Sequence, residues 1–153
     1  MTTLGVISDT HGLLRPEAAQ HLTGVDHIVH AGDIGSPDIV PALQNIAPVT
    51  AIKGNIDRAD WAREFADEEA LEIAGHKIFV LHNRNDLREP PEEAGYDIVI
   101  SGHSHKPNIE TIGGVLYLNP GSAGPRRFTL PIALALLELT KASAKPHIHE
   151  IPA

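Results

Sequence analysis

The chain has 153 residues, of which 42% are hydrophobic and 21% charged, and it carries a formal charge of −8 at pH 7. This length fits a single domain over residues 1–153, which buries roughly two-thirds of the surface of the unfolded chain. The absence of cysteine excludes disulfides, thiolate zinc sites and a cysteine nucleophile. The acidic balance offers no basic surface for long nucleic acids, and no apolar run reaches the roughly 18 residues of a membrane span. We therefore expect a cytoplasmic protein without membrane partners.

Seven short apolar runs rich in valine and isoleucine predict β-strands. They cover residues 4–8, 27–31, 49–53, 77–82, 98–101, 115–119 and 132–139. Helical patterns at residues 16–22 and 36–46 separate the first three runs, and the second begins with Ser36 as a cap and Pro37 in the first turn. This alternation of strand and helix predicts parallel pairing in the first half of the chain.

The second half is predicted to contain hairpins and hence antiparallel strands. Tight turns at Gly75-His76 and Gly113-Gly114 would join residues 72–74 to 77–81 and 109–112 to 115–118. A last pair, 131–140 with 145–151, could close a second sheet. The polar segments 58–69 and 84–95 are interpreted as surface helices or loops.

Metal-competent side chains follow five of the predicted strands, at the point where each strand ends. In chain order they are Asp9 with His11, Asp33, Asn55 with Asp57, His82, and His103 with His105. Because the carboxyl ends of parallel strands lie at one edge of a sheet, we expect these groups to gather there. A single aspartate after a strand is more often a turn cap, so the order of all five motifs is the specific signal.

Imidazole nitrogens combined with carboxylate and amide oxygens suit Mn, Fe, Ni or Zn. Seven such groups are too many for one tetrahedral ion and fit two ions that share a carboxylate. A pair of ions about 3.5 to 4 Å apart is used for in-line displacement at phosphorus, with a metal-bound hydroxide as the attacking group. Two other histidine features have simpler interpretations: His30 as a packed core residue, and His147 with His149 as a surface pair rather than a third metal site.

The motif series resembles, in order and over nearly the whole chain, the signature of the calcineurin-like metallophosphoesterases. The residues that carry the resemblance are Asp9-x-His11, Gly32-Asp33, Gly54-Asn55-x-Asp57, His82 and Gly102-His103-Ser104-His105. The short length and Asn119-Pro120-Gly121-Ser122, a segment that we interpret as structural, resemble the small prokaryotic phosphodiesterase branch of that family. The resemblance implies an α/β fold with four layers, an α-β-β-α sandwich of two mixed β-sheets flanked by helices.

The resemblance also implies roles for individual residues. One divalent ion would be held by Asp9, His11 and His105, the other by Asn55, His82 and His103, and Asp33 would bridge them. Manganese is the most expected ion, with nickel, iron or zinc as alternatives. The residues expected to act in catalysis are Asp33, Asn55, His103 and Asp57.

Two departures from the family pattern concern the substrate rather than the metal. Larger relatives place a histidine after the asparagine, where this chain has Ile56, so the general acid must come from elsewhere. Asp57 is a candidate for that acid, although it could equally orient His11 or His103. The segment after His82 is also altered, and its Arg84 could contact a phosphate together with Asn55, or be an ordinary surface arginine.

The sequence therefore predicts a dimetal phosphoesterase, foremost a phosphodiesterase that acts on small substrates. A phosphomonoesterase and a catalytically silent metal-binding scaffold or interaction module of the same fold are the alternatives. Arg126 and Arg127 could attract anionic substrates or simply be solvated. No segment identifies an oligomer interface, so a homo-oligomer remains open.

Overall fold

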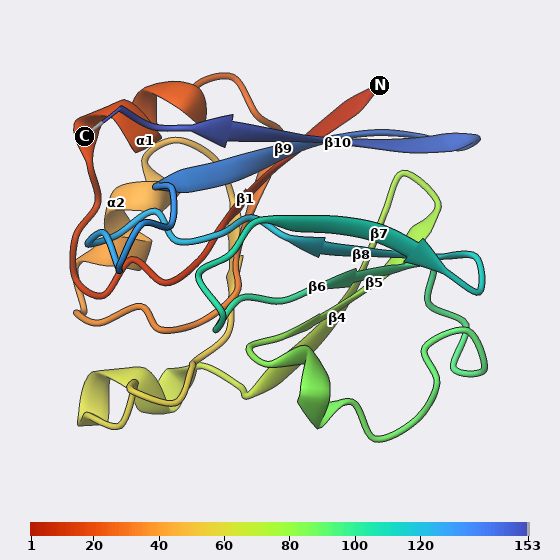
Figure 1. The fold of residues 1–153 in the computed structure, drawn as a ribbon, viewed down its shortest axis with the longest axis horizontal. Coiled ribbons are helices and arrows are strands. Elements are labelled where there is room, and N and C mark those ends of the chain that lie inside the picture. The colour runs from red at the N-terminus through yellow and green to blue at the C-terminus, as the bar shows by residue number, and fades with distance from the viewer. Residues whose placement is uncertain (153) are drawn as a thin grey trace.

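Two five-stranded β-sheets lie face to face in the computed structural model, which describes residues 1–152 (Figure 1). The first sheet has the order β10-β9-β1-β2-β3 and is built from β1 (Thr2–Ile7), β2 (His27–His30), β3 (Val49–Ala51), β9 (Ala133–Thr140) and β10 (Ser143–Glu150). The second has the order β4-β5-β6-β8-β7 and is built from β4 (Glu68–Ile73), β5 (His76–Leu81), β6 (Ile98–Ile100), β7 (Asn108–Ile112) and β8 (Val115–Asn119). Both sheets contain parallel and antiparallel pairs, which confirms the expected mixed sheets.

The first half of the chain forms the parallel strands that its pattern predicts. β1 pairs with β2 and β2 with β3 in parallel, and the crossovers contain α1 (Pro16–His21) and α2 (Ile39–Gln44). The last strand pair was expected to close a second sheet, and this expectation is wrong. β9 instead runs antiparallel to β1, with Leu4 opposite Leu137, because both strands are apolar on both faces and so belong in the interior of a sheet.

The second half contains the two expected hairpins, β4–β5 and β7–β8. They are not a purely antiparallel unit, however, because β6 lies between them and runs parallel to both β5 and β8. The first hairpin turns at Ala74-Gly75, one residue earlier than expected, with Ile73 opposite His76 and positive φ angles of 54° and 84° at the turn. β4 also begins at Glu68, inside a segment expected to be a surface helix or loop.

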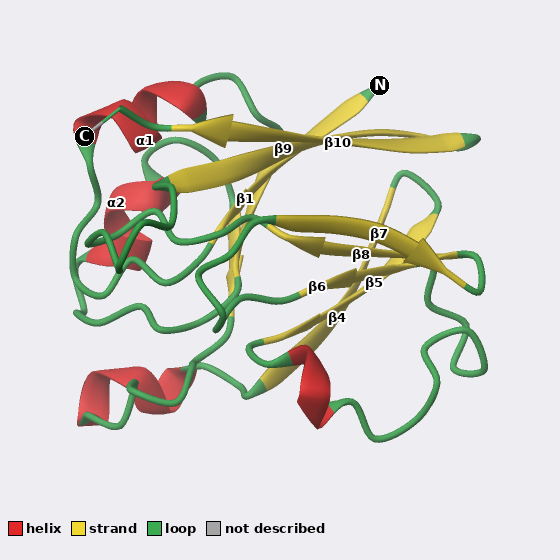
Figure 2. Ribbon diagram, viewed as in Figure 1, coloured by secondary structure: helices red, strands yellow, loops and turns green. Residues whose placement is uncertain are grey.

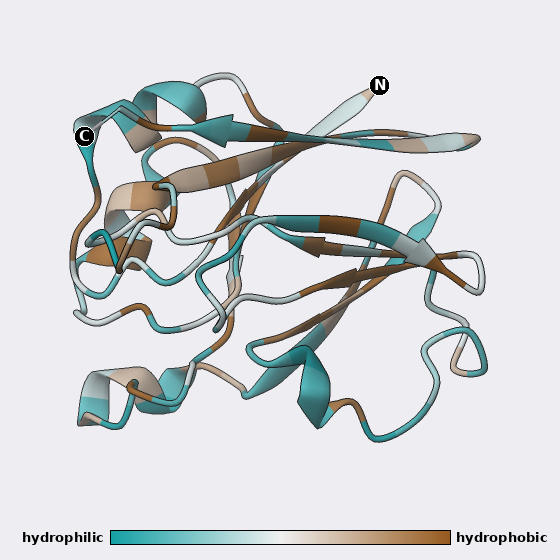
Figure 3. Cartoon of the chain, in the orientation of Figure 1, coloured by the Kyte–Doolittle hydropathy of each residue, from teal (hydrophilic) through white to brown (hydrophobic). Residues whose placement is uncertain are grey.

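Alternation along β1 divides its side chains between two cores. Leu4 and Val6 pack between the sheets, whereas Ile7 faces the helices. Gly5 also faces the helices, and a Cβ there would lie 2.5 Å from a Leu22 methyl carbon, so the glycine allows this close packing. Figure 3 shows the apolar residues concentrated along the strands.

The outer layers of the sandwich differ from each other (Figure 2). α1 and α2 cover the outer face of the first sheet through Ala18, Ile39 and Leu43. Leu87, next to the short 3₁₀ turn η2 (Arg84–Asp86), packs on the outer face of the second sheet. The other 3₁₀ helix, η1 (Asp60–Glu64), precedes β4 in the chain. Among residues 1–152, no helix has the length and apolar content needed to cross a membrane.

Candidate metal centre

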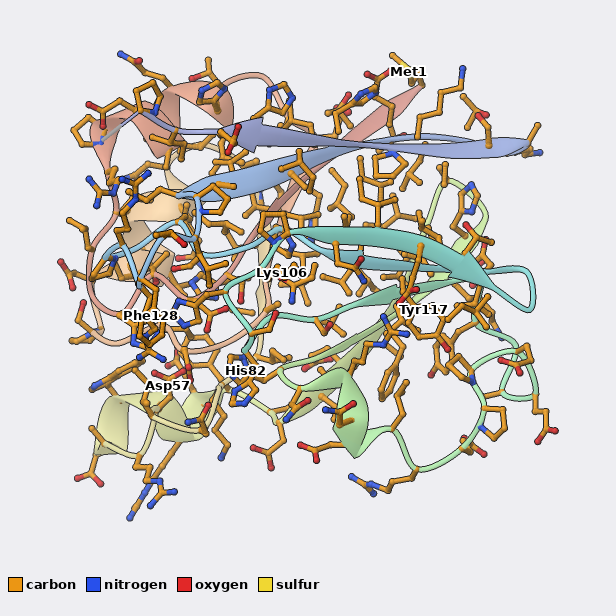
Figure 4. The ribbon with its side chains drawn as sticks, viewed as in Figure 1. Met1, Asp57, His82, Lys106, Tyr117 and Phe128 are labelled. Atoms are coloured by element: carbon orange, nitrogen blue, oxygen red, sulfur yellow. The ribbon has the colours of Figure 1, made fainter. Side chains whose placement is uncertain are left out.

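The five strand ends that carry the predicted ligands come from both sheets. In the first sheet, Asp9 and His11 follow β1, Asp33 follows β2 and Asn55 follows β3. In the second sheet, His82 follows β5, and His103 and His105 follow β6. The expectation that a single sheet edge gathers them is therefore wrong. The groups meet because the two sheets face each other with these ends on the same side, and Figure 4 shows His82 and Asp57 at that end.

One cluster consists of Asp9, His11 and His105, whose potential ligand atoms all lie within 4.8 Å of one another. Asp9 Oδ1 lies 3.4 Å from His105 Nε2 and 3.8 Å from His11 Nε2. These three residues are the set predicted to hold the first ion.

A second cluster consists of Asp9, Asp33 and His82. His82 Nε2 lies 3.1 Å from Asp33 Oδ2, and the same carboxylate oxygen lies 3.6 Å from His11 Nε2. Asp33 thus reaches histidines from both predicted ligand sets, and Asp9 also belongs to both clusters.

The remaining predicted ligands, His103 and Asn55, lie at the rim of this arrangement. The His103 ring stands edge-on to the His82 ring, with 5.2 Å between the centroids. Asn55, His82 and His103 together line a cavity of about 310 Å³. His103 belongs to neither of the two tight clusters.

Four buried polar atoms of the clusters have no hydrogen-bond partner within the described residues: Asp9 Oδ1, His11 Nε2, His82 Nε2 and His105 Nδ1. Buried polar atoms in folded proteins are nearly always bonded, because an unsatisfied one costs about 1 to 3 kcal/mol. Asp9 Oδ1 lies 3.8 Å from both His11 Nε2 and His82 Nε2, and His105 faces the same oxygen with its other nitrogen, Nε2. Nitrogen and carboxylate donors thus meet in one place, so the residues fit divalent ions of the transition series. Within residues 1–152 no third group of three or more such side chains is found.

The loops that carry the ligands are held in an unusual backbone conformation. Among residues 1–152, seven non-glycine residues have positive φ angles, and five of them are predicted ligands: Asp9 (54°), His11 (48°), Asp33 (56°), His103 (72°) and His105 (63°). The left-handed region is uncommon for residues with a Cβ, and it is concentrated at functional sites when it occurs.

Hydrogen bonds to neighbouring groups orient the ligands. Asp9 Oδ2 accepts from Ser8 Oγ at 2.7 Å and from the His103 backbone N–H at 3.1 Å, which leaves Oδ1 directed at the histidines. The Nδ1 of His82 lies 2.8 Å from the Ala31 carbonyl oxygen, to which it can only donate. This donation places the free Nε2 lone pair toward the aspartates, as metal-binding histidines require.

Charge and burial shift the pKa values of these groups. Burial raises the pKa of Asp33, but His82 and the Ile56 N–H outweigh it and lower that pKa to about 2. Burial lowers the pKa of His82, but Asp33, the Ala31 carbonyl and Asp9 outweigh it, so this pKa is raised. The pKa of His105 is lowered, first by burial and also by the charge of Arg127. The negative charges of Asp9 and Asp33 favour a proton on His82. A bound divalent ion would replace that proton.

Asp57 does not orient a histidine in the way the sequence suggested. Its carboxylate accepts three backbone N–H bonds, from Ile34, Gly35 and Gly54, each at 2.9 Å. Both oxygens are thus engaged as acceptors, and the residue joins the loops after β2 and β3.

Arg84 is held by protein partners rather than free for a phosphate. Its guanidinium carbon lies 4.3 Å from the centroid of the Tyr117 ring, and its Nη1 pairs with Glu110 Oε1. The ion pair occupies Nη1, so a phosphate could be contacted only through the remaining N–H groups of the guanidinium.

Other supporting residues were only partly foreseen. Ser122 Oγ donates to the Asp9 carbonyl at 2.9 Å, and Asn119 Nδ2 donates to the Gly102 carbonyl at 2.9 Å, so the segment 119–122 is structural as expected. His30 is fully buried, 2.9 Å from Thr10 Oγ1, and burial lowers its pKa to about 4. The hydroxyls of Ser8 and Thr10 on either side of Asp9 were the sequence signal for this network.

Comparisons with known proteins agree with the geometry. The model of the calcineurin-like phosphoesterase superfamily domain matches residues 2–142. A probable metallophosphoesterase of Methanocaldococcus jannaschii is 38% identical, over 93% of this chain and 79% of its own. The solved structure of an archaeal phosphodiesterase superposes with a TM-score of 0.80 at 26% identity, over 97% of this chain and 100% of the other. The structure of Vps29 from Entamoeba histolytica with Zn²⁺ shares the fold, with a TM-score of 0.76 at 23% identity, over 97% of this chain and 99% of the other. The chain belongs to the calcineurin-like phosphoesterase superfamily.

Proposed function

We propose that the protein is a phosphodiesterase that uses two divalent ions, foremost manganese, to hydrolyse small phosphodiesters. The observation that carries this proposal is the convergence of three buried atoms without a hydrogen-bond partner among residues 1–152, Asp9 Oδ1, His11 Nε2 and His82 Nε2, with His105 Nε2 3.4 Å from the same Asp9 oxygen. The superposition on an archaeal phosphodiesterase supports the reaction class.

Each predicted ligand has a task in this proposal. Asp9, His11 and His105 would hold one ion, Asn55, His82 and His103 the other, and Asp33 would contact both. Bound ions would activate a water molecule and neutralise the charge that develops on the phosphoryl oxygens.

Substrate would enter from the cavity of about 310 Å³ next to Asn55 and His103. Asn55 and His103 carry N–H donors at the rim of the buried clusters, where a phosphoryl oxygen would lie. Arg84 is already paired with Glu110, so it would contact a part of the substrate other than the phosphoryl group at the metal centre.

A second candidate, a metal-binding scaffold, is favoured by Ile56. This side chain is 45% exposed at the position where larger relatives carry a histidine. A scaffold of this fold would bind ions or partners and turn over no ester.

The test combines metal analysis with turnover. Protein prepared without chelator is analysed by mass spectrometry, and hydrolysis of bis(p-nitrophenyl) phosphate and p-nitrophenyl phosphate is measured with and without Mn²⁺. We expect about two ions per chain and manganese-dependent turnover, with the diester preferred.

Asp33→Asn should lower turnover at least about 100-fold and reduce metal content. Asp60→Asn, whose side chain is 92% exposed on η1, is the matched control and should change neither quantity. Preference for the monoester would replace the phosphodiesterase by a phosphomonoesterase. Two ions without turnover of either compound would favour the scaffold.

A further inference from the structure

A second cavity, of about 280 Å³, adjoins the first one and shares Asn83 and His103 with it as lining residues. It is bounded by the segments that follow β5 and β6 and by β8, and His103 lines both cavities. The two cavities are therefore the two places into which the two ester groups of a phosphodiester at the metal centre could extend.

The charges that line the two cavities are opposite in balance. Three carboxylates, Asp67, Glu68 and Asp86, line the first cavity together with Lys53 and Arg88. Both of these cations are already engaged, Lys53 with Asp67 at 3.9 Å and Arg88 with Glu68 at 3.2 Å. An anionic group in addition to the reacting phosphate would therefore be less favoured on this side than in the second cavity.

The second cavity has two cations and no carboxylate among its lining residues. Lys106 is exposed and forms no ion pair with any residue that the structure describes, whereas Arg84 is balanced by Glu110 behind it. In Figure 4 Lys106 stands beside the end of the second sheet that carries His82. The ammonium of Lys106, unpaired within the described residues, therefore favours binding of an anionic group in this cavity.

The rest of the lining suits a planar polar ring. Arg84 lies over the Tyr117 ring, and both line the cavity, so the guanidinium plane is fixed by stacking and by the ion pair with Glu110. The carboxamides of Asn83, Asn85 and Asn108 also line it and offer neutral donors and acceptors. A volume of about 280 Å³ is at the lower end of small-molecule sites, which accommodates one nucleoside rather than a polymer.

We propose that this cavity binds a nucleoside arm of the substrate that carries a second phosphate, with the base on the Arg84–Tyr117 stack and the phosphate on Lys106. The assignment rests on the proposed phosphodiesterase function, because His103 connects the cavity to the metal centre. It makes the protein selective for nucleotide-containing diesters over simple aryl diesters.

The test measures binding separately from turnover. Isothermal titration calorimetry on manganese-loaded protein compares adenosine 3′,5′-bisphosphate, adenosine 5′-monophosphate and ribose 5-phosphate, with chromatography to verify that the titrants stay intact. We expect the bisphosphate to bind about 10-fold more tightly than the monophosphate, and ribose 5-phosphate to bind more weakly than both.

Three variants assign the two preferences. Lys106→Gln should remove most of the advantage of the bisphosphate, whereas Lys145→Gln, an exposed lysine on β10, should leave it intact. Arg84→Lys keeps the charge but removes the plane, so it should remove the preference of adenosine 5′-monophosphate over ribose 5-phosphate. Equal binding of the bisphosphate and monophosphate, or an advantage that survives Lys106→Gln, would overturn the proposal.

Turnover of bis(p-nitrophenyl) phosphate by the same preparations separates this proposal from the proposed function. Turnover without discrimination among the two nucleotides and ribose 5-phosphate refutes the nucleotide cavity and leaves the phosphodiesterase. Discrimination that depends on Lys106, without turnover of bis(p-nitrophenyl) phosphate or of a dinucleoside monophosphate such as adenylyl-3′,5′-adenosine, refutes the phosphodiesterase and leaves a nucleotide-binding cavity.

Discussion

At the scale of single residues, the backbone is strained in the loops that carry the predicted ligands. A left-handed φ at a residue with a Cβ costs of the order of 1 kcal/mol, and five predicted ligands adopt one. The surrounding contacts must therefore hold these loops, and Asp57 contributes most visibly, because its buried carboxylate accepts N–H bonds from two different loops.

Replacing Asp57 by alanine should lower the free energy of unfolding by about 3 kcal/mol or more, because three backbone N–H groups lose their acceptor. Metal affinity should fall with it, since Asp33 lies in one of the loops that Asp57 joins. Urea denaturation and metal titration measure the two effects. Asp57→Asn retains one acceptor oxygen and should fall in between, whereas a wild-type-like Asp57→Ala would refute the structural role.

At the scale of elements, the strand ends deliver their ligands through glycines that leave no room for a side chain. A Cβ on Gly102 would lie 2.1 Å from Ser8 Oγ and 2.6 Å from Asp9 Oδ2. The loop after β6 thus contacts the Asp9 carboxylate directly. The small size of residue 102 allows this close approach between the two sheets at the metal centre.

Gly102→Ala is expected to displace the Asp9 carboxylate and weaken metal binding at least about 10-fold. Gly24→Ala is the control: it has a positive φ of 87° but nothing within 4 Å of the added Cβ, so it tests backbone strain without contact. Mass spectrometry of bound metal and thermal unfolding distinguish the two. Equal metal content in both variants would show that contact with Asp9 is unimportant.

At the scale of the whole molecule, two features connect the sheets at opposite ends. The predicted ligands join them at one end. At the other, buried His76 at the start of β5 places Nδ1 2.5 Å from Asp97 Oδ2 and Nε2 2.6 Å from the Thr140 carbonyl oxygen at the end of β9. Both partners are acceptors, so both bonds form only with the protonated ring.

Stability should accordingly fall at alkaline pH in a manner that depends on His76. Burial lowers the pKa of His76, but the Thr140 carbonyl and Asp97 outweigh it, so this pKa is raised. A raised pKa contributes stability that is fully present below the unfolded value of about 6.5 and is lost as pH rises through the folded value. The difference in unfolding free energy between wild type and His76→Asn should be larger at pH 6 than at pH 9, and a pH-independent difference would contradict this. His147→Asn, at a half-exposed site, is the control.

Metal removal should destabilise the sandwich, because the predicted ligands come from both sheets. A ligand present at about 100 times its dissociation constant stabilises a protein by about 2.7 kcal/mol. Chelation should lower the unfolding midpoint of the wild type, and His105→Ala should lose most of this difference. Identical midpoints with and without chelator would indicate that the ions do not bridge the sheets.

The sequence predicted which side chains gather in the two clusters better than it predicted the topology. Polar residues after Val/Ile-rich runs are local signals, so Asp9, Asp33 and His82 could be recognised at strand ends without knowing which sheet each strand joins. The pairing of β9 with β1 was not predictable locally, because it depends on contacts between residues more than 130 positions apart, such as Leu4 with Leu137. The role of Asp57 is also not a local signal, since two of its three partners, Ile34 and Gly35, lie in the loop after β2.

The insertion of β9 beside β1 has a consequence for synthesis of the chain. A nascent polypeptide that has emerged only as far as Asn119 already contains every predicted ligand, yet β1 lacks its antiparallel neighbour. Its buried edge would be exposed, and unpaired apolar edges promote association between chains. Synthesis of β9 would thus end the period in which this edge of β1 is exposed to other chains.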